Sequence, residues 1–161
     1  MLGPEDRLDL TRLGPVRIGM TLAEAEQAAG VPFVVPQMQP DVDGLCTVVR
    51  PESTLPGVTF LLVDQRITMI HIDAPATNPT RSGVRVGSSE QQVRETYGDA
   101  LEEREHPYYA DESGRAVYLV VVPDGERQSL LVEVVDGTVT SFSVGLLPQL
   151  IAGYGEGCVA S

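Results

Sequence analysis

The sequence predicts an α+β fold: two tandem repeats, each a short helix followed by an antiparallel meander, forming one antiparallel sheet with both helices on one face. Two internal matches predict this arrangement. The pattern at 16–30 recurs at 84–98, and the hairpin-like stretch 63–72 aligns with 135–144. Because both matches keep the same chain order, each repeat unit is expected to be one helix followed by strands.

Each copy of the first pattern predicts a capped helix. Thr21 is placed to N-cap the first helix, and Glu24 to complete a capping box. Gly30 stands where a left-handed C-cap residue is favoured. A helix of about nine residues is marginal alone in water, so each helix must dock its apolar face on the sheet. The second copy has Ser89, Gln92 and Gly98 at these positions.

The strands can be placed in chain order, and seven or eight are expected. Pro32 and Pro36 make 31–36 an edge strand at most. Asp136-Gly137 favours a tight hairpin turn between the last two strands. The other strands are expected at 45–49, 58–63, 67–72, 101–109, 116–122, 130–135 and 138–144. The domain organisation is a polar lead-in at 1–13 without predicted regular structure, repeat 1 at 14–73, a linker at 74–82, repeat 2 at 83–145 and a C-terminal tail at 146–161.

Composition excludes several classes of partner. The formal net charge is −12, which disfavours binding to nucleic acid or to an anionic membrane surface. No run of eighteen or more apolar residues is present, so no membrane insertion of this segment is expected. No CxxC motif or His/Cys cluster indicates a metal or a redox cofactor, and none is expected.

The two cysteines bear on the cellular compartment. A Cys46–Cys158 disulfide would tie the tail back to the first repeat, and such bridges persist in oxidising compartments. The alternative is two unrelated buried thiols. The acidic, proline-containing start at 1–6 is no signal peptide, which leaves a cytoplasmic protein or an exported one whose signal has been removed. We expect an extracellular, periplasmic or cell-envelope location.

The helix-start motif resembles a known family. Gly19-Met20-Thr21, with Glu24 and Gly30, resembles the β-lactamase-inhibitor-protein family and is similar to the small lipoprotein of the outer-membrane barrel-assembly machine. The resemblance implies a tandem-repeat sheet, export and inhibitor-like protein binding. The inhibitor has a disulfide within each repeat, which this chain lacks. The whole chain also resembles exported bacterial proteins of unassigned function that share the motifs found here at 84–87, His106 with Tyr108, and 156–158.

Candidate functional residues are few. His71 is either a polar residue of a half-exposed sheet face or a ligand or pH switch. His106, Tyr108 and Tyr109 surround a proline and form either an ordinary strand edge or a recognition patch. No Ser-His-Asp set or nucleophile elbow is indicated, so no catalytic residue is assigned.

The first hairpin predicts a binding surface because it is apolar on both faces. Helices on one side would leave the other to be covered by a partner protein, a second copy or the tail that leads to Cys158. By alternation, one side carries Val58, Phe60, Leu62, Ile67 and Met69, and the other Leu61, Val63, Ile70 and Ile72.

We therefore expect a non-enzymatic protein–protein interaction module that binds an unknown partner or itself. The alternatives are a hydrolase or sugar-modifying enzyme that uses His71 and His106, and a structural envelope component. The expected binding residues are Phe60, Met69, His71, His106, Tyr108 and Tyr109.

Overall fold

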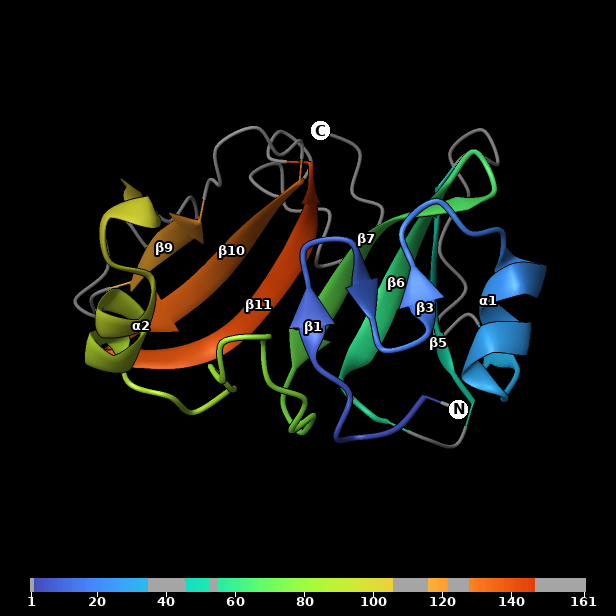
Figure 1. Ribbon diagram of the computed structural model, residues 1–161, viewed down its shortest axis with the longest axis horizontal. Coiled ribbons are helices and arrows are strands. Elements are labelled where there is room, and N and C mark those ends of the chain that lie inside the picture. Colours follow the sequence, from blue (N-terminus) through green and yellow to red (C-terminus); the bar gives the residue numbers. More distant parts are fainter. Residues whose placement is uncertain (1, 35–45, 53–54, 106–115, 122–127, 147–161) are drawn as a thin grey trace.

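The computed structural model describes residues 2–34, 46–52, 55–105, 116–121 and 128–146 (Figure 1). Its main element is an eight-stranded antiparallel sheet, with strand order β4-β5-β6-β7-β11-β10-β9-β8. The strands are β4 (Phe33–Val34), β5 (Cys46–Pro51), β6 (Val58–Val63), β7 (Arg66–Asp73), β8 (Leu101–Glu105), β9 (Ala116–Val121), β10 (Gln128–Val135) and β11 (Thr138–Leu146).

The predicted α+β class is wrong, because the described chain is mostly β. A second, three-stranded sheet forms from the lead-in, for which no regular structure was expected, and from the start of repeat 1; each helix has only eight residues. The strands of the small sheet are two residues long, too short for an alternating pattern to identify them. These elements are β1 (Leu8–Asp9), β2 (Arg12–Leu13), β3 (Val16–Arg17), α1 (Leu22–Ala29), α2 (Glu90–Tyr97) and the 3₁₀ turn η1 (Gly98–Ala100).

The small sheet and the two helices share one core with the large sheet. In Figure 1 the small sheet lies over the middle of the large sheet, between α1 and α2. Leu13 and Val16 of the small sheet, Ala25 of α1 and Val93 of α2 are all 0% exposed and belong to one hydrophobic cluster. A separate cluster lies on the opposite face of the large sheet and contains Leu61, Met69, Tyr118, Val120 and Leu131.

Equivalent positions of the two sequence repeats make matching contacts. Gly19 N donates to Ile67 O at 2.7 Å, and Gly87 N donates to Val139 O at 2.8 Å. The two halves meet where β7 pairs with β11, and there His71 stands directly opposite its own equivalent, Ser143. A pseudo-two-fold axis therefore passes through the sheet between these two residues.

The expected split of the first hairpin into two faces is wrong for β7. Leu61 is opposite Met69, whereas Leu62 is opposite Ile67, so Thr68 is an extra, bulged residue. A bulge reverses the alternation beyond it. Met69 consequently packs with Leu61 on the second face, and Ile70 and Ile72 join Phe60 in the main core.

The helix starts agree with the predicted caps. Thr21 Oγ1 accepts from Glu24 N at 3.3 Å, and Glu24 Oε1 accepts from Thr21 N at 3.0 Å, which completes the capping box. In α2, Ser89 Oγ accepts from Gln92 N at 3.0 Å. The C-terminal glycines differ: Gly30 has the left-handed geometry (φ 79°, ψ 10°), whereas Gly98 (φ 53°, ψ −126°) leads into η1.

We predict that Thr21→Ala and Ser89→Ala each lower the free energy of unfolding by about 1 kcal/mol, because each leaves a first-turn N–H without its acceptor. Urea unfolding of the purified variants measures this. Thr11→Ala is the matched control, since Thr11 is exposed in a turn. Unfolding midpoints equal to that of the control would contradict the capping role.

Candidate binding site between the small sheet and the second helix

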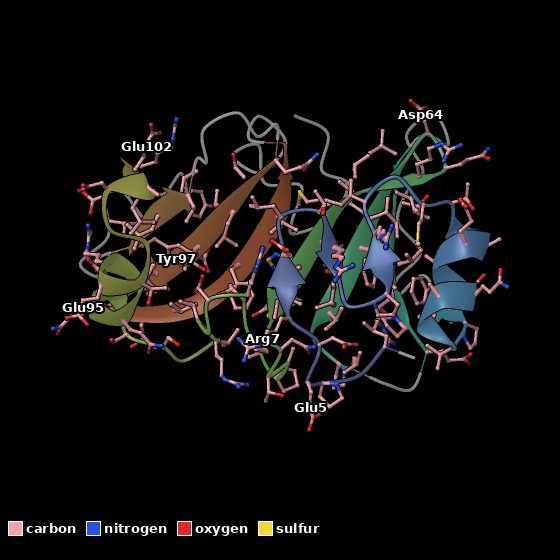
Figure 2. All side chains as sticks on the ribbon, in the orientation of Figure 1. Glu5, Arg7, Asp64, Glu95, Tyr97 and Glu102 are labelled. Atoms are coloured by element: carbon pink, nitrogen blue, oxygen red, sulfur yellow. The ribbon has the colours of Figure 1, made fainter. Side chains whose placement is uncertain are left out.

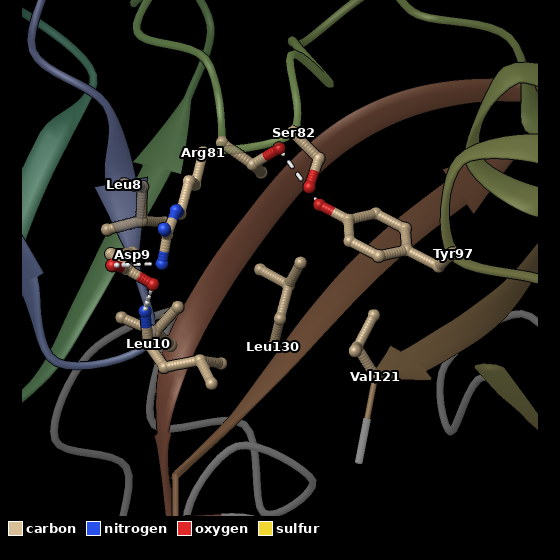
Figure 3. A pocket seen from close by; sticks show the side chains of 10 residues that line it. Leu8, Asp9, Leu10, Arg81, Ser82, Tyr97, Val121 and Leu130 are labelled. Carbon is tan, nitrogen blue, oxygen red and sulfur yellow. Dashed lines mark hydrogen bonds and ion pairs between the residues drawn. The ribbon is translucent and has the colours of Figure 1, made fainter. Parts of the chain in front are cut away.

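An apolar pocket of about 150 Å³ opens on the helix-bearing side of the large sheet (Figure 3). Its floor is formed by β9, β10 and β11, and its walls by β1, the 80–82 loop and α2. Apolar side chains line most of it, and polar groups lie around the rim. The lining residues are Leu8, Asp9, Leu10, Thr80, Arg81, Ser82, Tyr97, Val121, Leu130 and Val144.

The pocket lies over the second half of the sheet, where the covering side chains differ from those of the first half. In the first half, Phe60 stacks on Phe33 with ring centroids 5.2 Å apart. The residue of β10 that corresponds to Phe60 is the smaller Val132. The small sheet packs its buried side chains over the middle of the sheet, and the space between it and α2 stays open.

Tyr97 forms the α2 wall and is held in place at its hydroxyl. The Tyr97 side chain points from α2 toward the sheet, whereas Glu95 and Glu102 point outward (Figure 2). Its hydroxyl donates to Thr80 Oγ1 at 2.9 Å and is also hydrogen-bonded to Ser82. Burial raises the pKa of Tyr97, so the hydroxyl stays protonated at neutral pH. The ring is therefore a fixed, neutral wall.

Backbone hydrogen bonds join the other two walls. Leu8 N donates to Pro79 O at 2.8 Å, and Arg81 N donates to Leu8 O at 2.9 Å. The Asn78 amide donates to Gly3 O and Asp6 O at 3.0 and 2.9 Å. The segment expected to be a linker is thus bound along the segment expected to be an unstructured lead-in.

An exposed ion pair stands at the mouth of the pocket. Arg81 Nη1 lies 3.5 Å from Asp9 Oδ2, and the Arg81 side chain is 78% exposed. A pair this exposed contributes little stability, so Arg81 is free to exchange partners. The same two residues also border a polar cleft of about 520 Å³, here named the arginine cleft, which is lined by Glu5, Asp6, Arg7, Asp9, Arg12, Gly14 and Arg81.

The expected binding residues do not gather at this pocket. Phe60 and Met69 are each 1% exposed, Phe60 stacked in the main core and Met69 packed on the opposite face, so neither presents a surface to a partner. His106, Tyr108, Tyr109 and Cys158 lie outside the described residues. Sequence reasoning missed the pocket residues because most of them lie in the lead-in, the linker and separate strands. The alternation of Leu8 and Leu10 was the one local signal of a buried face there.

His71 lies on the opposite face of the sheet, where its side chain is half-buried. His71 Nδ1 and Ser143 Oγ are hydrogen-bonded at 2.5 Å. Serine beside histidine is the start of a nucleophile–base pair. Ser143 is only 4% exposed, however, which leaves its oxygen no room to carry a substrate group. The contact is better explained as a cross-strand hydrogen bond at the pseudo-two-fold axis.

Burial lowers the pKa of His71, and the carboxylates of Asp73 and Glu133 only partly oppose this. The other strands packed beside it present Thr59 and Ser143, which carry no charge. The folded protein therefore keeps His71 neutral at pH values where the unfolded chain has already bound a proton. Stability contributed by neutral His71 is present above about pH 6.5 and falls as the pH drops below it.

We predict that the free energy of unfolding decreases below about pH 6.5 and that His71→Ser removes the histidine part of this decrease. Serine is the residue that the second repeat has at this position. Urea unfolding at a series of pH values, compared between the two proteins, separates His71 from the carboxylates. Parallel curves for the wild type and the variant would show that His71 does not contribute.

No protein-family model matches the sequence, and no curated protein matches it significantly. The resemblance to the β-lactamase-inhibitor-protein family therefore stays a prediction. No helix in the described ranges is long and apolar enough to cross a membrane. Within the same ranges, no group of three or more histidine, cysteine, aspartate or glutamate side chains is placed to hold a metal ion.

Proposed function

We propose that this protein is a non-enzymatic protein-binding module, and that its apolar pocket receives one side chain of a partner protein. The pocket is the observation that carries this proposal. Its volume of about 150 Å³ suits a benzene-sized group. Sites that enclose a whole small-molecule ligand are typically about 300–1,000 Å³. The smaller size therefore favours an anchoring side chain of a larger partner over a free metabolite.

The two edge strands of the large sheet are unsuited to pairing with a strand of a partner, which favours binding at the pocket. At one edge, β8 carries the exposed and charged Glu102, Glu103 and Arg104. At the other edge, β4 is only two residues long. Charged or very short edge strands resist pairing with another chain. A partner is accordingly expected to dock on the side that carries the small sheet and α2.

The polar groups of the pocket suit binding better than catalysis. The Tyr97 hydroxyl is protonated and bonded to Thr80, and Thr80 Oγ1 also accepts from Val84 N at 3.1 Å. Asp9 accepts from the backbone N–H of Leu10 and pairs with Arg81. A general base needs a lone pair within reach of the substrate. These groups instead provide a polar rim around an apolar anchor site.

Tryptophan scanning at two adjacent positions tests the proposal. Leu10 lines the pocket and is half-buried, whereas the neighbouring Thr11 is exposed and outside it. The natural chain has no tryptophan, so each variant also reports its own environment by fluorescence. Leu10→Trp should fill the pocket and show blue-shifted emission, and Thr11→Trp should do neither.

Peptides selected from a random display library on the wild-type protein are the binding probes. We expect them to contain a large apolar residue, to bind Thr11→Trp as tightly as the wild type, and to lose at least about tenfold in affinity for Leu10→Trp. Selected peptides that bind Leu10→Trp unchanged, or a selection that yields no binder, would overturn the proposed function.

We further propose that the protein is exported and acts in the cell envelope or the medium. The support is the pair of cysteines, which suits an oxidising compartment, together with the family resemblance. Cys46 begins β5, while Cys158 lies outside the described residues, so their pairing stays a prediction.

We predict that the non-reduced protein has no titratable thiol and that reduction lowers its melting temperature. A bridge across so long a loop contributes at most about 4–5 kcal/mol. Thiol titration in denaturant, followed by melting with and without reductant, measures both effects. Two free thiols in the non-reduced protein would remove the main support for export.

A further inference from the structure

Two arginines stand directly opposite each other on the outer face of the small sheet. Arg12 of β2 pairs in register with Arg17 of β3, and both are exposed. The neighbouring pair, Leu13 and Val16, faces the core, so the arginines project outward. Like charges directly opposite destabilise an antiparallel pair. Asp9 of β1 stands opposite Arg12 on its other side and offsets part of this repulsion, so the remaining conflict lies at Arg17. Such a conflict is expected where a residue serves function better than stability.

Neither guanidinium has a hydrogen-bond or ion-pair partner within the described residues. Within the described residues, the nearby carboxylates Glu5, Asp6 and Asp9 form no ion pair with Arg12 or Arg17. Asp9 pairs with Arg81 and accepts from Leu10 N, and Asp6 Oδ2 accepts from Gly3 N at 2.8 Å. The two arginines therefore keep their donors available for an external acceptor.

These arginines belong to a larger charged surface beside the apolar pocket, where the carboxylates Glu5, Asp6 and Asp9 stand among the arginines. The arginine cleft contains Arg7, Arg12 and Arg81, and Arg17 adjoins Arg12 across the small sheet. Figure 2 shows Arg7 next to the small sheet, with Glu5 nearby. Four of the chain's 11 basic residues lie here, so with the three carboxylates of the cleft the surface has a formal charge of +1 in a chain whose net charge is −12. We name this set of four the arginine face.

We propose that the arginine face binds carboxylates of the same partner segment whose apolar side chain enters the pocket. This inference rests on the proposed function. The guanidinium fork matches a carboxylate with two parallel hydrogen bonds. Asp9 and Arg81 border both the pocket and the arginine cleft, so the acidic group stands close to the apolar anchor along the partner chain. The partner is thus an acidic peptide segment with a large apolar residue.

The net charge of the chain disfavours a polyanion, such as nucleic acid, more strongly than a short acidic peptide. At −12 the whole chain repels nucleic acid over distances longer than a contact. Once the apolar residue of an acidic segment is bound in the pocket, its carboxylates are held close to the arginines at a high effective concentration. Their binding then needs no long-range attraction. Carboxylates on an anchored peptide are therefore the favoured ligand.

Three synthetic peptides and two arginine variants test the inference. One peptide has a central phenylalanine flanked by glutamates, the second has glutamines in place of the glutamates, and the third has glutamates around a central alanine. The variants are Arg12→Thr and Arg17→Thr. The matched control is Arg104→Thr, which makes the same charge change on β8, where Arg104 pairs with Glu102. Calorimetric titration measures the affinities.

We expect the glutamate–phenylalanine peptide to bind about tenfold more tightly than its glutamine counterpart. Arg12→Thr and Arg17→Thr should abolish this difference and leave the glutamine peptide unaffected, whereas Arg104→Thr should preserve it. Without peptide, Arg17→Thr should melt at a higher temperature than the wild type, because the like-charge pair is relieved.

The two proposals fail in different ways. Equal affinity for the glutamate and glutamine peptides, with both lost in Leu10→Trp, would overturn the carboxylate inference and leave the pocket as the binding site. Equal affinity for the two glutamate peptides would overturn the proposed function, because the apolar anchor would then add nothing. An unchanged difference in both arginine variants would also overturn the inference.

Discussion

Covering an apolar face of a wide sheet is the constraint on which the rest of this structure depends. The large sheet has eight strands, and its helix-bearing face carries fully buried side chains from Phe60 in β6 to Phe142 in β11. Two helices of eight residues each cover only the ends of such a surface. The chain therefore adds a third covering element, the small sheet, which brings Leu8, Leu13 and Val16 against the middle of the large one.

The two repeats correspond in their helices and hairpins but differ in the elements that cover the large sheet. The N-caps, the hairpins and the bulges at Thr68 and Thr140 correspond. Thr68 Oγ1 donates to Leu61 O at 3.5 Å, whereas Thr140 Oγ1 donates to Glu133 Oε1 at 2.6 Å. Only the first repeat has a small sheet in front of it, formed by β1, β2 and β3. The segment that precedes the second repeat instead runs along β1 and is hydrogen-bonded to it. The frame is approximately two-fold but has a single covering sheet, and the pocket beside Tyr97 lies between this sheet and α2.

Sequence reasoning located the hairpins and helix starts, because these depend on local chemistry. Thr21 and Ser89 cap their helices, and the turns at Asp64 and Asp136 have the positive φ values of tight hairpins. The small sheet was missed because strands of two residues carry almost no periodic signal. The bulge at Thr68 reversed the faces beyond it, which alternation alone cannot show. The pocket depends on contacts between β1 and the 80–82 loop that no local pattern records.

The position of the unpaired arginines also follows from how the small sheet covers the core. Elements that are buried on both sides cannot carry unpaired arginines, since an unpaired buried charge is strongly destabilising. The small sheet has one buried and one exposed face, and it lies over the middle of the molecule, next to the open pocket. It is thus the element on which Arg12 and Arg17 can project unpaired at modest cost. One face of this short sheet covers the core, and the other carries the arginines that we propose as a recognition surface.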